Sequence, residues 1–279
     1  MNITDLKNLL NTRALQKCLN AAKTIRYLNR GEPIHYGSHK LRYIPGTRPV
    51  RLKYINSPIG IVKNDARQIQ FFLDNLHPGD LVLDVGGNVG QYTVLFGSLV
   101  APNGKVVAFE PDPLSKKMLA RNVALNGFSD RIQIEELALF DTNGTHSFFS
   151  AGGEATASLV AAASGGGKGT SVSGGQEFTV KTMRLDDYLS SKNLKSPDWI
   201  KLDAEGAEIN ILNGARDVLQ SQAKIICELH PYAWPSFGTS FEELMSLVEE
   251  SGRTISYLDS SLKIEDGPSY GATLILPKS

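Results

Sequence analysis

The sequence is poor in cysteine, in excess charge and in long apolar runs, and each shortage argues against a class of protein. Its two cysteines, Cys18 and Cys227, lie far apart, so a disulfide scaffold is not expected. The 29 basic residues balance 29 acidic ones, so nothing favours nucleic acid or an anionic membrane as a partner. No run reaches the ~20 apolar residues of a membrane span, and the first residues do not resemble a signal peptide. We therefore expect a cytoplasmic protein without membrane insertion.

The most informative stretch is LVLDVGGNVGQYTVLF, residues 81–96. Its apolar start predicts a buried strand that runs into Asp84, and its second half predicts an apolar helix. The intervening loop contains Gly86, Gly87, Asn88 and Gly90. Glycines allow a sharp turn close to a ligand, and the start of the helix offers unpaired N–H groups. The pattern is typical of a nucleotide-type cofactor site.

Two acidic residues indicate which cofactor this is. Asp84, just before the loop, would repel a pyrophosphate and suits a ligand that carries an ammonium group, such as S-adenosylmethionine. Glu110 ends the next expected strand, where it can accept hydrogen bonds from both ribose hydroxyls. These features disfavour the alternative of a nicotinamide-dependent oxidoreductase. The remaining interpretation is a tight turn followed by two solvated acids.

From residue 81 onward, expected strands and helices alternate, which predicts an α/β protein with a parallel sheet. The strands are expected over residues 81–85, 105–110, 131–136, 177–182, 198–202, 223–229, 254–258 and 271–276. The helices are expected over residues 68–76, 90–100, 113–126, 185–191, 206–220 and 240–251.

The flanking and inserted segments suggest the domain organisation. Apolar spacing predicts a helix over residues 3–29, and the Pro- and Arg-containing segment 33–60 predicts an irregular cap with a short strand. Together they make an N-terminal helical arm and cap, residues 1–56, before a catalytic domain at 57–279. Within that domain the Gly/Ala/Ser-rich segment 151–175 is expected to be a flexible insertion.

Acidic residues recur at the expected strand ends, where ligands bind in open parallel sheets. They are Asp84, Glu110, Asp203 and Glu228. Asp203 is read as a site residue, whereas Glu205 is equally well a site residue or a group that complements the helix dipole. His230 lies two residues after Glu228, a suitable place for a general base. Lys201 and Glu208 are read as structural.

With these residues in place, the chain resembles the FkbM-type methyltransferases, a branch of the class I S-adenosylmethionine-dependent enzymes. The resemblance spans roughly residues 57–276 and rests on five ordered stretches: LVLDVGGNVGQYTVLF, VVAFEPDPLSKKMLARNVALNG, TMRLDDYL, WIKLDAEGAEINILNGA and IICELHP. It implies a doubly wound, mostly parallel seven-stranded Rossmann-like sheet whose last strand is antiparallel. It also implies O-methylation of a sugar, a glycan or another natural-product acceptor.

The resemblance also implies roles for individual residues. The implied cofactor-binding residues are Asp84, Gly86, Gly87, Asn88, Gly90, Glu110, Pro111, Leu137 and Ala138. The glycine loop would line the methionine end, Glu110 would hold the ribose, and Leu137 and Ala138 would frame the adenine. Asp112 is expected near the ribose or adenine edge. Gly87 stands where the family more often has alanine, a difference that is neutral for binding.

Methyl transfer to oxygen needs a group that removes the proton of the acceptor hydroxyl. The candidate catalytic residues are Asp203, His230, Glu228 and Glu205. Asp203 or His230 can act as a direct base. Alternatively, Asp203 and Glu228, completed by His230, can hold a divalent cation such as Mg²⁺ or Mn²⁺. The sequence does not choose between them. A non-catalytic cofactor-binding protein is the second functional alternative, and the acceptor and the oligomeric state stay open.

Overall fold

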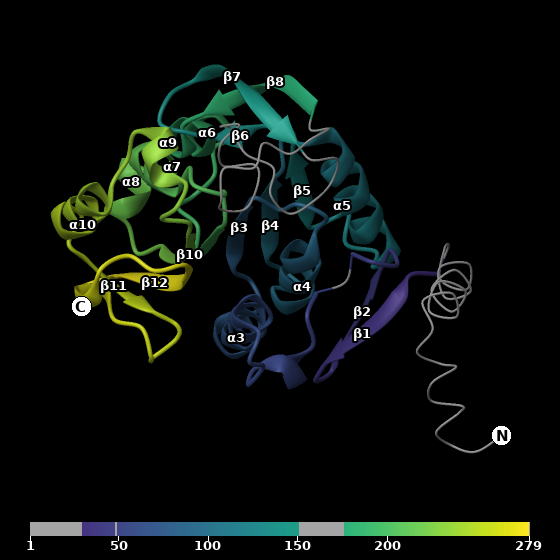
Figure 1. The fold of residues 1–279 in the computed structure, drawn as a ribbon. Coiled ribbons are helices and arrows are strands. Elements are labelled where there is room, and N and C mark those ends of the chain that lie inside the picture. The colour runs from purple at the N-terminus through teal and green to yellow at the C-terminus, as the bar shows by residue number, and fades with distance from the viewer. Residues whose placement is uncertain (1–29, 48, 151–175, 279) are drawn as a thin grey trace.

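The computed structural model describes residues 30–47, 49–150 and 176–278 (Figure 1). The predictions of a helix over 3–29 and of a flexible insertion at 151–175 therefore lie outside the described residues. Within the described ranges, no helix is both long and apolar enough to cross a lipid bilayer.

The core of the molecule is a seven-stranded sheet. Its strands are β3 (Leu81–Val85), β4 (Lys105–Phe109), β5 (Ile132–Glu135), β9 (Trp199–Leu202), β10 (Lys224–Leu229), β11 (Arg253–Tyr257) and β12 (Gly271–Pro277). Their spatial order is β11-β12-β10-β9-β3-β4-β5. The strands from β5 to β10 run parallel, and β12 runs antiparallel to both β10 and β11. The predicted doubly wound sheet with an antiparallel last strand is confirmed.

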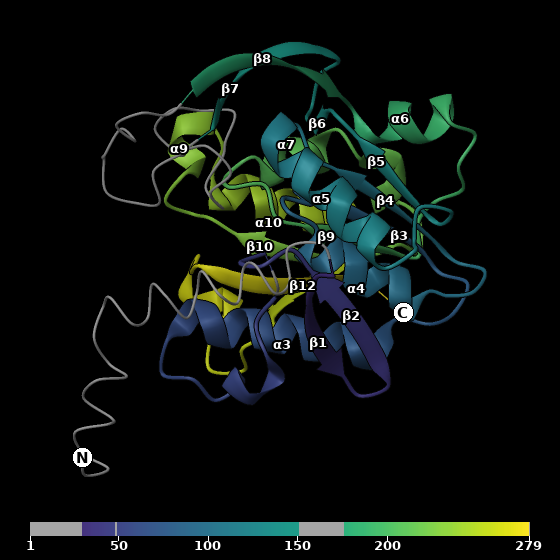
Figure 2. The same cartoon turned by 90° about the vertical axis from the view of Figure 1, so that its right-hand side faces the viewer.

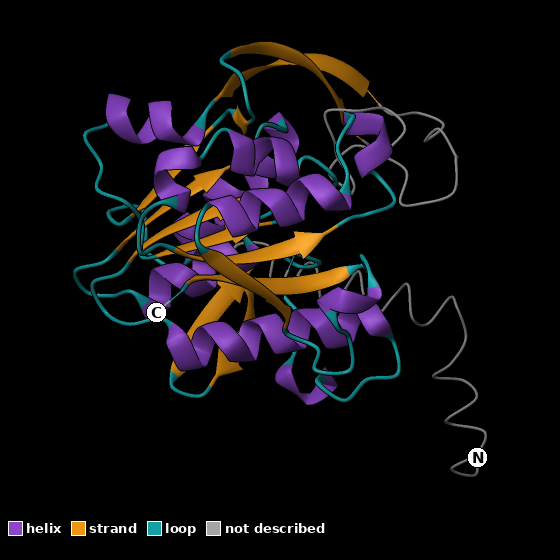
Figure 3. Ribbon diagram, turned by 90° about the vertical axis from the view of Figure 1, so that its left-hand side faces the viewer, coloured by secondary structure: helices purple, strands orange, loops and turns teal. Residues whose placement is uncertain are grey.

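Helices cover both faces of this sheet (Figure 3). On one face lie α3 (Gly60–Asn75), α4 (Gln91–Leu99) and α5 (Pro113–Leu125). On the other face lie α6 (Leu185–Ser191), α7 (Glu208–Asn213), α8 (Arg216–Leu219) and α10 (Phe241–Glu250). Two short helical segments follow strands of the main sheet: α9 (Trp234–Phe237) follows β10, and the 3₁₀ turn η2 (Ile264–Asp266) follows β11. Side chains alternate along a strand, so Val82 of β3 packs toward α3 and α4 while Leu83 packs toward the opposite layer.

A second, three-stranded sheet lies at one end of the main sheet (Figures 1 and 2). It consists of β6 (Ala138–Leu139), β7 (Gly144–Ser150) and β8 (Gln176–Met183), in the order β6-β8-β7. The strand expected at 177–182 is therefore present, but it pairs outside the main sheet. Its partners β6 and β7 fall in a region that the sequence left without assigned structure.

The segment before the main sheet is more regular than expected. Instead of an irregular cap with one strand, residues 33–60 contain most of a hairpin, β1 (Glu32–Tyr36) paired with β2 (His39–Tyr43), and the 3₁₀ turn η1 (Leu52–Tyr54). In β1 burial alternates residue by residue, which packs Ile34 and Tyr36 into the core beside α4. Helix α3 also begins eight residues earlier than residue 68. The boundary at residue 56 stays a prediction.

The single helix expected over 206–220 is two helices, α7 and α8, and this prediction is wrong. The chain leaves the helical path at Gly214 and Ala215, between them. A side-chain Cβ at Gly214 would lie 2.2 Å from the carbonyl oxygen of Phe140, so another backbone segment packs directly against this point. That contact comes from more than seventy residues away in the chain, and helical periodicity alone does not predict it.

Candidate active site

A cavity of about 530 Å³ lies at the carboxyl ends of β3, β4, β9 and β10. Every candidate catalytic or cofactor-binding residue named from the sequence lines it, except Gly90 and Asp112. This is the edge of the sheet at which ligands bind in doubly wound folds. The residues chosen from strand ends far apart in the sequence therefore share one cavity.

The glycine loop forms one wall of the cavity. The N–H groups of Gly86 and Gly87 both donate to the carbonyl oxygen of Phe109, which fastens the loop to the end of β4. Gly86 has φ +79°, and a Cβ there would lie 1.9 Å from the carbonyl oxygen of Asp203. Gly90 has φ +84° and precedes the first residue of α4. Only glycine fits at Gly86, because it combines left-handed backbone with direct contact to β9's end.

Asp84 is fully buried under this loop. Its Oδ2 accepts a hydrogen bond from the Thr93 hydroxyl, and its Oδ1 lies 4.0 Å from Lys201 Nζ. Among the described residues, Oδ1 has no hydrogen-bond partner. Burial raises the pKa of Asp84, although Lys201 and Thr93 act in the opposite direction. A buried carboxylate oxygen without a donor fits a ligand ammonium group.

Glu110 joins the two loops that frame the other side of the cavity. Its Oε2 accepts from the Asn88 N–H at 2.7 Å and its Oε1 from the Asp112 N–H at 2.8 Å. Burial raises the pKa of Glu110 to about 8. Pro111, Leu137 and Ala138 line the cavity nearby with apolar atoms, as a flat aromatic ligand requires. These four residues line the same cavity, and their ribose and adenine contacts stay predictions.

Asp112 differs from the expectation. Its Oδ1 accepts hydrogen bonds from the N–H groups of Leu114 and Ser115, so it caps the N-terminus of α5. It does not line the cavity. Asp112 is therefore a helix cap, favoured there because its carboxylate pairs two otherwise unsatisfied N–H groups.

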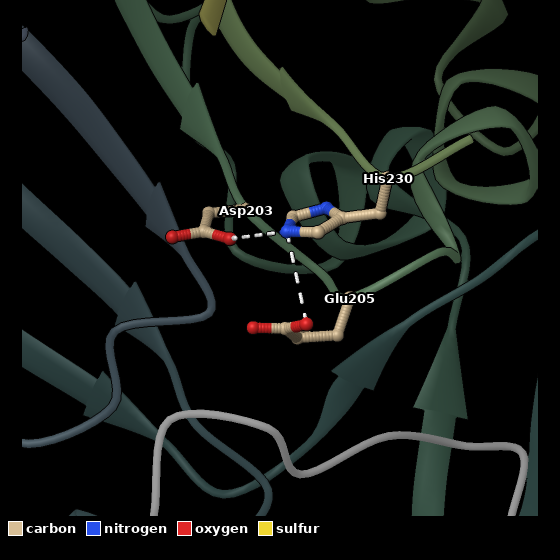
Figure 4. A group of neighbouring side chains, drawn as sticks. All are labelled: Asp203, Glu205 and His230. Atoms are coloured by element: carbon tan, nitrogen blue, oxygen red, sulfur yellow. Dashed lines mark ion pairs between the residues drawn. The ribbon is translucent and has the colours of Figure 1, made fainter. Parts of the chain in front are cut away.

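In the same cavity, Asp203, Glu205 and His230 converge from two different loops (Figure 4). His230 Nε2 lies 3.9 Å from Asp203 Oδ1 and 3.7 Å from Glu205 Oε2. One ligand atom from each of the three residues fits within 4.8 Å, a spacing that could hold a metal ion. The expected metal set of Asp203, Glu228 and His230 is thus replaced here by one containing Glu205.

Glu208 holds His230 in this position. Its Oε1 accepts from His230 Nδ1 at 2.8 Å and from the Gly206 N–H at 2.8 Å, and its Oε2 accepts from Trp234 Nε1 at 2.9 Å. Burial lowers the pKa of His230, but Glu208, Glu205 and Asp203 outweigh it and raise that pKa to about 10. The imidazole is therefore a cation at neutral pH in the ligand-free protein, which makes it a hydrogen-bond donor before it is a base.

The two carboxylates beside His230 differ in charge state. Although burial favours the neutral acid, Lys201 at 3.0 Å and His230 hold the pKa of Asp203 below its usual value. Burial raises the pKa of Glu205 to about 7, with His230 opposing the shift. Glu205 also has φ +50°, an uncommon conformation for a residue with a side chain. A carboxyl group with a pKa near 7 is well matched to taking a proton at neutral pH.

Glu228 belongs to a different set of contacts. It accepts hydrogen bonds from Asn64 Nδ2 at 3.1 Å, from Gln68 Nε2 at 2.8 Å and from the Tyr270 hydroxyl. Asn64 and Gln68 lie on α3, and Tyr270 directly precedes β12. Burial raises the pKa of Glu228. The structure thus brings Glu228 to the cavity but surrounds it with neutral donors.

The aromatic residues after β10 also separate into two roles. Tyr232 is 45% exposed, and its hydroxyl donates to Glu205 Oε2 at 3.2 Å, at the edge of the acidic cluster. Trp234 is buried and donates to Glu208. Only Tyr232 is therefore accessible to an acceptor, whereas Trp234 anchors the loop.

Several cavity residues were missed from the sequence. They include Ile61, Asp65, Tyr92 and Tyr270. Asp65 comes from α3, and a signal for it existed: Asn64 and the fully buried Gln68 stand four residues apart on one helix face, an unusual place for two amides. Nothing in the sequence around Tyr270 indicates a site.

Comparison with known proteins identifies related chains. Residues 84–255 match the Methyltransferase FkbM domain. The 2-O-methyltransferase NoeI of Sinorhizobium fredii is 30% identical over 58% of this chain and 67% of its own length. The hexuronic acid methyltransferase AglP of Haloferax volcanii is 28% identical over 58% of this chain and 61% of its own length. The crystal structure of methyltransferase FkbM from Methylobacillus flagellatus aligns with this chain at a TM-score of 0.44 and 14% sequence identity. The alignment covers 77% of this chain and 52% of the chain in that crystal structure.

Proposed function

The chain belongs to the FkbM family of methyltransferases, and from this premise we propose that it methylates a hydroxyl oxygen of a sugar or related acceptor, using S-adenosylmethionine. The names of two relatives support this reaction class, one as a 2-O-methyltransferase and one as a hexuronic acid methyltransferase. Both relatives match 58% of this chain, at 30% and 28% identity, and the match covers 61% of the second relative's length. Neither relative's acceptor is therefore assigned to this chain. The acceptor is named here only by its chemistry, as a hydroxylated molecule.

The observation that carries the cofactor assignment is Asp84 Oδ1, a buried carboxylate oxygen without a hydrogen-bond partner among the described residues. It lies beside the glycine loop, where a phosphate would be repelled and an ammonium group would be bound. In this proposal Glu110 accepts hydrogen bonds from the ribose hydroxyls, and Leu137 and Ala138 contact the adenine. S-adenosylmethionine supplies an activated methyl group when it is bound there.

The cluster of Asp203, Glu205 and His230 would position the acceptor and remove its proton. In the first way, a carboxylate of the cluster, Asp203 or Glu205, accepts the hydroxyl proton directly, while His230 donates to the acceptor or to the carboxylates. In the second way, Asp203, Glu205 and His230 would hold a divalent cation, and such a cation would supply Lewis acidity that lowers the pKa of the acceptor hydroxyl. In both ways the charge of Asp203 takes part: as the base, as the partner of His230 beside Glu205, or as a ligand. Neither way uses that charge for cofactor binding.

Replacing Asp203 by asparagine tests the proposal because it keeps the shape and removes the charge. Methyl transfer to candidate glycans, measured by mass spectrometry, should fall by at least ~100-fold. Isothermal titration should show nearly unchanged affinity for S-adenosylhomocysteine and no binding of NAD. Asp130→Asn changes an exposed turn whose carboxylate is hydrogen-bonded to its neighbour Arg131, and it should leave turnover unchanged. Full activity of Asp203→Asn toward the same acceptor would place the proton acceptor elsewhere.

Chelation separates the two ways of removing the proton. If EDTA abolishes methyl transfer and Mg²⁺ or Mn²⁺ restores it, the cluster coordinates a cation. If EDTA has no effect, a carboxylate acts as the base directly. The S-adenosylhomocysteine affinity, measured with and without EDTA, controls for an indirect effect on the cofactor.

A further inference from the structure

One wall of the cavity comes from outside the matched segment 84–255. It includes Ile61 and Asp65 of α3 and Tyr270, which precedes β12. Tyr270 is 39% exposed and Ile61 is 61% exposed, so the wall combines accessible apolar surface with an acid. Below we call these three residues the α3 wall.

The cavity beside this wall is strongly acidic. Among the described residues, the lining carboxylates are Asp65, Asp84, Glu110, Asp203, Glu205 and Glu228, and the lining cations are Lys201 and His230. Both cations already bind carboxylates: Lys201 Nζ lies 3.0 Å from Asp203 Oδ2, and His230 Nδ1 lies 2.8 Å from Glu208 Oε1. No described cation lining the cavity is therefore left to pair with an acidic group on an acceptor.

Two of these acids, Asp84 and Glu110, are assigned to the cofactor in the proposed function. The other acids are left to face the acceptor, and Asp65 of the α3 wall is one of them. Burial, together with the charges of Glu228 and Asp203, raises the pKa of Asp65 to about 7. The same field that resists a negative charge on Asp65 would resist a carboxylate or phosphate brought by an acceptor.

We propose that the α3 wall selects acceptors that are neutral or carry an ammonium group near the reacting hydroxyl, that it rejects the matching carboxylates, and that Asp65 sets this preference. An ammonium or hydroxyl group can donate to Asp65, whereas a carboxylate would meet like charge without a free cation. Ile61 and Tyr270 line the same cavity and add the apolar surface that the C–H faces of a sugar ring require. This inference rests on the proposed function.

Matched glycosides test it without knowledge of the natural acceptor. The probes are methyl glycosides with the gluco, galacto and manno configurations, each with a hydroxyl, an amine or a carboxylate at carbon 6. Their binding to the protein saturated with S-adenosylhomocysteine is measured by saturation-transfer NMR. For at least one configuration, the amine and hydroxyl forms should bind at least ~10-fold more tightly than the carboxylate form, a difference of about 1.4 kcal/mol.

Two variants assign the preference to Asp65. Asp65→Asn should reduce the ratio of amine to carboxylate affinity severalfold, because it removes the ionisable carboxyl group and keeps the shape. Asp74→Asn, an exposed acid on the same helix, should leave the ratio unchanged. Titration of each variant with S-adenosylhomocysteine verifies that it is folded.

The outcomes separate this inference from the proposed function. Equal or tighter binding of the carboxylate forms, or an unchanged ratio in Asp65→Asn, would overturn the inference. Binding of none of the glycosides by a protein that binds S-adenosylhomocysteine would overturn it as well. Absence of S-adenosylhomocysteine binding by the unmodified protein would instead overturn the proposed function.

Discussion

Replacing Glu110 by alanine should weaken both the fold and cofactor binding. The side chain is 5% exposed, and its two oxygens accept from the N–H groups of Asn88 and Asp112 at 2.7 and 2.8 Å. Each N–H left without a partner in a buried site costs about 1–3 kcal/mol. The free energy of unfolding should therefore fall by roughly 2–6 kcal/mol, toward the lower end if water enters the cavity and pairs with these groups.

Cofactor affinity should fall as well, for a separate reason. The alanine variant lacks the acceptor placed for the ribose hydroxyls, which should weaken S-adenosylhomocysteine binding by ~1–3 kcal/mol. Glu110→Gln keeps the shape and one acceptor oxygen, but it turns an amide donor toward one of the two N–H groups. It should therefore lie between the unmodified protein and Glu110→Ala in both measurements.

The assays are urea unfolding of the ligand-free protein and isothermal titration with S-adenosylhomocysteine. Glu136→Gln is the matched control, because Glu136 is 49% exposed and pairs with Lys116 at the surface. Loss of the ion pair between Glu136 and Lys116 should change the free energy of unfolding by at most ~1 kcal/mol. If Glu110→Ala unfolds at the same urea concentration as the control and binds S-adenosylhomocysteine normally, Glu110 neither joins the loops nor holds the ribose.

Two further predictions concern the backbone of the glycine loop and the charge of the histidine. Gly86→Ala should abolish S-adenosylhomocysteine binding and lower the melting temperature sharply, because its Cβ would lie 1.9 Å from the Asp203 oxygen. Gly238→Ala, also at positive φ but with nothing within 4 Å, should cost only ~1–2 kcal/mol, and equal effects would refute the contact. The carboxylates around His230, Glu208 foremost, raise its pKa to about 10 against the burial that lowers it; the stability from this shift is present below about pH 6.5 and lost as the pH rises toward 10. Glu208→Gln should flatten the fall in melting temperature between pH 6.5 and 10, and an unchanged pH profile would contradict the assigned protonation.

The parts of the fold that could be predicted depend on contacts local in the sequence. The strand into Asp84, the glycine loop and the following helix form one continuous stretch, so alternation and glycine chemistry suffice to predict them. The same holds for the acids at strand ends, because parallel strands bring their carboxyl ends to one edge. The cavity confirms their common location, while their individual roles stay predictions.

The parts that were missed depend on contacts distant in the sequence. The break between α7 and α8 arises where Phe140 packs against Gly214, and β7 and β8 pair across a long stretch of chain. The protonation of His230 depends on Glu208, Glu205 and Asp203. From the sequence, Asp203 was interpreted as a site residue, Glu205 was left open and Glu208 was interpreted as structural. Periodicity reports which face of an element is apolar, but it does not report what covers that face.

Side-chain alternation connects these distant contacts to the proposed specificity. Asp84, Lys201 and Glu228 share the face of the sheet that α3 and α4 cover, as their contacts with Thr93, Tyr92 and Gln68 show. The helices on that face therefore contribute to the cavity as directly as the strand ends do. The matched segment 84–255 includes α4 but not α3. The specificity proposed for α3 and Tyr270 therefore falls on residues outside the matched segment, whereas the glycine loop and the proposed catalytic carboxylates fall inside it.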